Sequence, residues 1–85
     1  MADVIRNGDD FTVEAKVIAD GLDLPEHAIA RGMSNGAITT RFERGEGEDE
    51  GRFRLSFFHR ERVLRLTVDA SGNILSRARF DRKKG

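Results

Sequence analysis

Residues 52–80 read RFRLSFFHRERVLRLTVDASGNILSRARF. Apolar and polar side chains alternate along this stretch, and the alternation breaks at HRER (59–62) and at ASG (70–72). A period of two residues is the pattern of a β-strand with one buried face. The stretch therefore predicts three strands of an antiparallel sheet, joined by two short turns.

A further strand is expected upstream, over ITTRFE (38–43), where the same alternation is found. The four strands then form a meander in chain order. The turn at 59–62 places Phe57 opposite Leu64, which keeps apolar side chains together on one face of the sheet. Between the first two strands, the same matching predicts Phe42 opposite Phe53.

The segment before the sheet is predicted to be helical. Four of its apolar residues recur at helical spacing: Val13, Val17, Ile18 and Leu22. They predict a helix over about 13–21, with Thr12 as its N-cap. Pro25 then opens a second helix, which Asn35 and Gly36 end. The expected fold is α+β, with two short N-terminal helices packed on one face of a four-stranded antiparallel β-meander.

The remaining segments are polar. We expect a disordered N-terminal tail over 1–10, one α+β domain over 11–80, and a basic C-terminal tail over 81–85. The connection 43–52, ERGEGEDEGR, is acidic and rich in glycine. Its composition favours disorder, and the alternative is that it folds back over the arginines of the sheet.

Several classes of protein are disfavoured by what the sequence lacks. The chain has no cysteine, which excludes disulfides, thiolate zinc sites and cysteine nucleophiles. There is no apolar run of a signal peptide or a membrane span, so we expect a cytoplasmic protein with no membrane contact. His27 and His59 have no partners at metal-binding or catalytic spacing, so we expect no enzyme, no metal and no cofactor.

The formal net charge of zero conceals an uneven distribution. Residues 1–50 contain 12 Asp and Glu against 5 Lys and Arg, whereas residues 51–85 contain 3 against 10. Such a basic half is typical of a surface for an anionic partner, although it can also pair with the acidic half of the same chain or remain simply solvated.

The polar face of the predicted sheet is rich in arginine. Five arginines are expected there as candidate anion-binding residues: Arg41, Arg54, Arg65, Arg77 and Arg79. The expected register places Arg41 opposite Arg54, and Arg65 opposite Arg77. Like charges directly opposite each other are destabilising, and an anion across them would relieve the repulsion. The leading hypothesis is therefore a non-enzymatic binding module for nucleic acid or an acidic protein. The alternative is that salt screens exposed, splayed arginines.

Two other functions fit the same pattern. Phe58, Val63 and Leu75 are expected on the arginine face, and an exposed apolar strip there would serve as a homodimer or partner interface. Two helices followed by a sheet also match a degenerate winged-helix DNA-binding domain, in which His27 and Arg31 would face the DNA.

The chain also resembles a family of small uncharacterised proteobacterial proteins, known only as a domain of unknown function. The resemblance is carried by FTVEA (11–15), LDLPEHAI (22–29), NGAITTRFERG (35–45), RLSFFHRERVLRLTVDASGNIL (54–75) and RARF (77–80). It implies a bacterial cytoplasmic protein of unassigned role, and it transfers no site residues.

Overall fold

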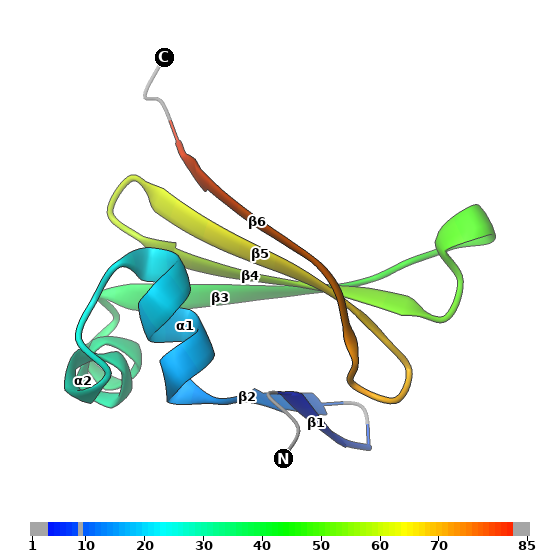
Figure 1. Cartoon of the computed structure of the whole chain (residues 1–85), viewed down its shortest axis with the longest axis horizontal. Coiled ribbons are helices and arrows are strands. Elements are labelled where there is room, and N and C mark those ends of the chain that lie inside the picture. Colours follow the sequence, from blue (N-terminus) through cyan, green and yellow to red (C-terminus); the bar gives the residue numbers. More distant parts are fainter. Residues whose placement is uncertain (1–3, 9, 83–85) are drawn as a thin grey trace.

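A computed structural model describes residues 4–8 and 10–82 of the chain. Its elements, in chain order, are β1 (Val4–Asn7), β2 (Asp10–Val13), α1 (Ala15–Leu22), α2 (His27–Asn35), β3 (Ile38–Arg44), η1 (Gly47–Asp49), β4 (Arg52–His59), β5 (Arg62–Asp69) and β6 (Ile74–Asp81). Strands β3–β6 form one antiparallel sheet in chain order (Figure 1). The α+β class and the four-stranded meander are thus confirmed. Within the described ranges, no helix is long and apolar enough to cross a membrane.

The centre of the fold is the pairing of β4 with β5. Three apolar pairs lie on one face of it: Phe53 with Val68, Leu55 with Leu66, and Phe57 with Leu64. All six side chains are buried. This register is the one that the sequence predicted, because the turn between the strands is short and apolar residues match only in that alignment.

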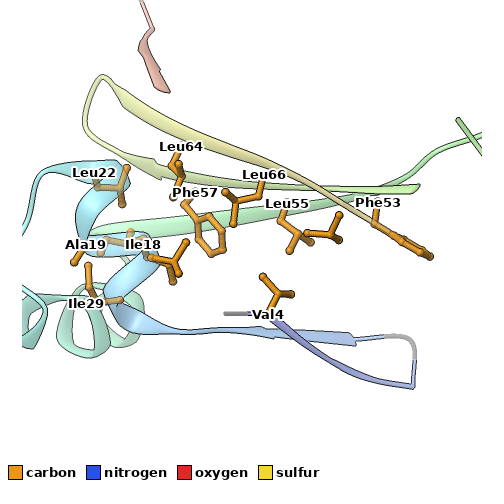
Figure 2. Packing of buried hydrophobic residues seen from close by; sticks show 13 residues of the cluster. Val4, Ile18, Ala19, Leu22, Ile29, Phe53, Leu55, Phe57, Leu64 and Leu66 are labelled. Carbon is orange, nitrogen blue, oxygen red and sulfur yellow. The ribbon is translucent and has the colours of Figure 1, made fainter. Parts of the chain in front are cut away.

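Both helices lie on the apolar side of the sheet (Figure 2). Helix α1 contacts β4 and β5, and α2 contacts β3. Two glycines permit the close approach. A Cβ on Gly21 would lie 2.4 Å from a methyl group of Leu64, and a Cβ on Gly32 would lie 2.6 Å from the Cδ1 of Ile38. A side chain at either position would require the helix or the facing side chain to move.

A β-hairpin precedes the helices, which are therefore not the first elements of the fold. Residues 4–8, expected in a disordered tail, form β1 and the start of its turn. Val4 is 1% exposed and belongs to the core. Thr12 lies in β2 rather than at a helix start, and α1 begins after Glu14 with no side-chain cap. Residues 1–3, 9 and 83–85 lie outside the described part of the chain.

The hairpin docks against the turn that joins β5 to β6. The Arg6 guanidinium donates a hydrogen bond to the Ala70 carbonyl at 3.0 Å. Gly72 has a φ of +91°, and a Cβ there would lie 2.8 Å from the Val4 carbonyl oxygen. Only glycine accommodates both this backbone conformation and the contact.

Asp69 holds that turn together. Its carboxylate accepts hydrogen bonds from the backbone N–H groups of Ser71 and Asn73 and from the Asn73 side-chain amide. The side-chain amide of Asn73 makes the largest contribution to holding the pKa of Asp69 below its usual range. Because the pKa is lowered on folding, these bonds stabilise the turn at neutral pH, and the stabilisation is lost as the pH falls through the lowered pKa.

The register between β3 and β4 differs from the expected one by two residues. Phe42 lies opposite Leu55, not Phe53. Arg41 therefore lies opposite Ser56, and Arg54 lies opposite Glu43. The acidic connection between these strands is long and sets no register by itself. The observed alignment replaces a like-charge pair with an opposite-charge pair.

Strand β6 contains a bulge that reverses the facing of its second half. Val68 pairs with Ile74 and Thr67 with Ser76, so Leu75 is the extra residue. As a result, Arg77 and Arg79 lie on the helix side of the sheet, whereas the sequence predicted them on the opposite side. The Arg79 guanidinium donates to the Asp20 carbonyl in the last turn of α1 at 3.1 Å. A cation is favourable at this end of a helix, because its last carbonyls lack helical partners.

The acidic connection is partly regular. Gly47–Asp49 form the short 3₁₀ turn η1, which Figure 1 shows beyond the far end of the sheet. The Gly45 N–H donates to the Arg52 carbonyl at 2.8 Å and closes the base of the loop. The segment therefore extends the β3–β4 hairpin and does not fold back over it.

Replacing Val4 with alanine tests the role of the hairpin. We expect a loss of about 2 kcal/mol in the free energy of unfolding, because a buried side chain is truncated. Ile5→Ala is the matched control, since Ile5 is 48% exposed and its truncation should change stability by less than about 0.5 kcal/mol. Denaturant titration of both variants measures the difference. Equal effects of the two substitutions would contradict the docking of β1 on the core.

Candidate functional site

One face of the sheet is covered by no helix or strand of the described residues, and we call it the outer face. Both helices and the β1–β2 hairpin lie on the other side (Figures 1 and 2). The register gives the residues that project from the outer face between the strand ends: Thr39, Arg41, Glu43, Arg54, Ser56, Phe58, Val63, Arg65, Thr67, Ser76, Ala78 and Phe80. Arginine is thus the commonest residue on this face.

Three of the five candidate arginines come together there. Arg41, Arg54 and Arg65 lie on the outer face, on three neighbouring strands. Arg77 and Arg79 lie on the opposite face, as a consequence of the bulge in β6. Neither predicted like-charge pair forms, because Arg54 lies opposite Glu43 and Arg65 lies opposite Ala78. The candidate site is smaller than the sequence indicated.

At the centre of the outer face, three residues of β3, β4 and β5 lie in one row. Ser56 lies between Arg41 on one neighbouring strand and Arg65 on the other. Ser56 is 1% exposed, and its Oγ has no hydrogen-bond partner. The Nε of Arg65 is also buried and without a partner. A buried polar group without a partner costs about 1–3 kcal/mol, so this pair is a local defect in the stability of the sheet.

The chemistry of the Ser56 Oγ and the Arg65 Nε indicates which kind of hydrogen-bond partner would satisfy both. A guanidinium Nε–H can only donate a hydrogen bond. A serine hydroxyl can both donate and accept, but the Ser56 Oγ and the Arg65 Nε have no hydrogen-bond partner, so they do not bond to each other. Two donors on neighbouring strands therefore lack an acceptor. An oxygen of a phosphate or a carboxylate would accept from both. Sequence reasoning missed Ser56, although it is a small hydroxyl residue between the outward-facing Arg54 and Phe58 of the same strand.

Aromatic rings lie at the next row of the same face. Phe58, Val63 and Phe80 are cross-strand neighbours on β4, β5 and β6. The Arg65 guanidinium lies 5.0 Å from the centre of the Phe80 ring, and the Arg82 guanidinium lies 4.7 Å from that of Phe58. These are distances of cation–π contact, so each ring is covered by a long, charged side chain.

The predicted apolar interface is not one continuous strip. Val63 is fully buried beneath its neighbours, and Phe58 is half-buried. Leu75 is 49% exposed, but it occupies the bulge near the other end of β6. Leu75 is therefore separated from the neighbouring pair Phe58 and Val63, and only Phe58 and Leu75 retain exposed surface.

Two of the hollows in the surface are lined mainly by residues outside the outer face. One, of about 420 Å³, is bounded by the β1–β2 hairpin, the helices and the edge of the sheet, and it includes Phe11, Met33 and Phe42. The other, of about 860 Å³, surrounds the β4–β5 turn and includes His59, Arg62 and Asp81. In this second hollow, Arg62 forms ion pairs with Asp23 at 3.3 Å and with Asp81 at 3.7 Å. Across residues 4–8 and 10–82, no group of three His, Asp or Glu is placed to hold a metal ion.

A Ser56→Ala substitution tests the description of the central row. We expect it to raise the free energy of unfolding by about 1 kcal/mol, because it removes a buried hydroxyl without a partner. Ser76→Ala is the matched control on the same face, where the side chain is exposed. It corrects for the lower strand preference of alanine. A loss of stability in Ser56→Ala beyond that of Ser76→Ala, measured by thermal or denaturant unfolding, would contradict the assignment.

Comparison with known proteins gives a family and no activity. A family model described as a family of unknown function, DUF6522, matches residues 1–85. No curated protein and no solved structure matches the chain. The arrangement of residues on the outer face is therefore the basis for a functional hypothesis.

Proposed function

The chain belongs to the family of unknown function DUF6522, and because that membership assigns no activity, we propose one from its own residues. The protein is a non-enzymatic binding module that holds single-stranded nucleic acid on its outer face. Arg41, Arg54 and Arg65 contact phosphates, and Phe58 and Phe80 lie where bases can stack.

One observation carries this proposal. The Ser56 Oγ and the Arg65 Nε are buried donors without an acceptor, on the only row of the outer face that has an arginine on each side of a serine. A phosphate oxygen between them would satisfy both donors. Arginine also presents a planar fork that matches the oxygens of a phosphate. Access requires movement of the side chains that bury these two atoms.

The neighbouring aromatic row favours a single strand over a duplex. Proteins that bind single-stranded nucleic acid combine positive charge along the backbone with aromatic rings on which bases stack. Phe58 and Phe80 lie one row from the Arg41–Ser56–Arg65 row. Their rings now contact the guanidinium groups of Arg82 and Arg65. A base can take the place of a guanidinium on a ring while the freed arginine contacts a phosphate. In a duplex the bases are already stacked on one another.

Fluorescence anisotropy with a labelled oligonucleotide of about 16 residues at about 50 mM salt tests the proposal. We expect a Kd at or below about 100 µM, with log Kd rising with log salt at a slope of about 2, as three phosphate contacts require. Arg65→Gln or Arg54→Gln should weaken binding and lower the slope by about 0.7. Arg77→Gln is the matched control, because it removes the same charge from the opposite face.

The other outcomes identify the competing functions. If Arg77→Gln and Arg65→Gln weakened oligonucleotide binding equally, net charge alone would account for the affinity. That result would overturn the assignment of the site to the outer face. Tighter binding of an acidic peptide than of the oligonucleotide would favour an acidic protein as partner. Binding that prefers duplex DNA and depends on Arg31 of α2 would favour the winged-helix alternative. The proposal would be overturned if none of these probes bound.

A further inference from the structure

Strand β3 is a free edge of the sheet. It pairs with β4 on one side only, and within the described chain no strand pairs with its other side. Ile38 is buried, but every residue from Thr39 to Arg44 is exposed. A strand edge of this kind presents unpaired backbone N–H and C=O groups, which another strand can complete.

An apolar surface continues from this edge on the helix side of the sheet. Phe42 is 44% exposed and borders the hollow of about 420 Å³ beside the β1–β2 hairpin. Its ring centre lies 5.4 Å from that of Phe11 and 5.8 Å from that of Phe53. Phe42 is therefore the outermost ring of a group of three, with one side open at the edge of the sheet.

We propose that two copies of this chain pair through their β3 edges, antiparallel, around a two-fold axis at Phe42. The inference does not rest on the nucleic-acid proposal. A two-fold axis perpendicular to the sheet keeps the outer faces of both copies on the same side, so each residue must pair with one that faces the same way. Only a few alignments of β3 with itself satisfy this condition.

The charged residues of β3 favour one of these alignments. With Phe42 at the axis, Arg41 of each copy lies opposite Glu43 of the other, which makes two opposite-charge pairs. An axis at Arg41 or at Glu43 places two like charges against each other, which is destabilising. An axis at Thr40 leaves the same charges without a partner. Within the described residues, neither Arg41 nor Glu43 takes part in an ion pair, so both remain available.

The apolar surface favours the same alignment. Residues directly opposite each other in an antiparallel pair have Cβ atoms about 5 Å apart. The two Phe42 rings would therefore meet across the axis and join the two groups of three rings into one. A single alignment thus completes the backbone hydrogen bonds, pairs the charges and covers Phe42.

The other edge of the sheet, β6, has two of its charged side chains partnered within the chain. Asp81 forms an ion pair with Arg62 at 3.7 Å, and Arg79 donates to the carbonyl of Asp20. The bulge at Leu75 also twists this strand away from a regular edge. Strand β3 is regular along its whole length and is the better edge for a second copy.

Analytical ultracentrifugation without nucleic acid tests this inference. Edge pairing alone gives a small interface and hence a weak dimer, so the protein concentration should be varied from about 10 µM to about 500 µM. We expect a monomer–dimer equilibrium in the unchanged protein. Arg41→Glu and Glu43→Arg should each raise the dimer Kd by about tenfold or more, because each puts like charges opposite each other twice. The double variant Arg41→Glu/Glu43→Arg should return the Kd to near its original value.

Arg77→Glu is the matched control, a charge reversal on β6 that should leave the dimer unchanged, and circular dichroism checks the fold of each variant. A monomer at all concentrations overturns the inference. A dimer Kd that neither single charge reversal changes also overturns it. So does a Kd that the double variant does not return to near its original value. Because no nucleic acid is present, failure here is distinct from failure of the proposed function.

Discussion

The structure depends on the strip of three apolar pairs between β4 and β5, Phe53 with Val68, Leu55 with Leu66, and Phe57 with Leu64. Because side chains alternate between the faces of a strand, a shift of one residue would turn every one of these groups toward the outer face. Buried residues of the helices and the hairpin join these pairs in one core cluster. Their positions, and hence the bare outer face, follow from that single alignment.

The sequence predicted the parts of the fold that depend on this alignment, and it failed where other constraints operate. The β4–β5 register was correct because a short turn and an alternating pattern specify it together. The β3–β4 register was wrong because the acidic connection is too long to specify one. The facing of the β6 residues after Leu75 was wrong for a different reason. The bulge at Leu75 shifts the alternation by one residue, and nothing in the composition of the strand indicates it. The β1 strand was missed because Val4 is a single buried residue within a polar segment.

The candidate site was predicted in part for the same reason. Arg54 and Arg65 belong to the two central strands, and their facing follows from the apolar strip. Arg41 kept its face because the error in its register was two residues, which preserves the alternation. Arg77 and Arg79 lie on the opposite face from the predicted one because they follow the bulge. The unpartnered Ser56 hydroxyl was beyond sequence reasoning, because it depends on which residues flank it on both neighbouring strands.

Arg41 connects the two proposals. It flanks Ser56 on the outer face, and at the β3 edge it would lie opposite Glu43 of a second copy. If both hold, dimerisation and phosphate binding share one side chain and must be thermodynamically linked, with each changing the affinity of the other by the same factor. A phosphate that draws Arg41 away from Glu43 of the second copy would loosen the dimer. A strand of nucleic acid that crosses the axis would oppose this effect, because the outer faces of the two copies form one continuous surface. The sign of the linkage therefore reports whether one bound strand contacts one copy or both.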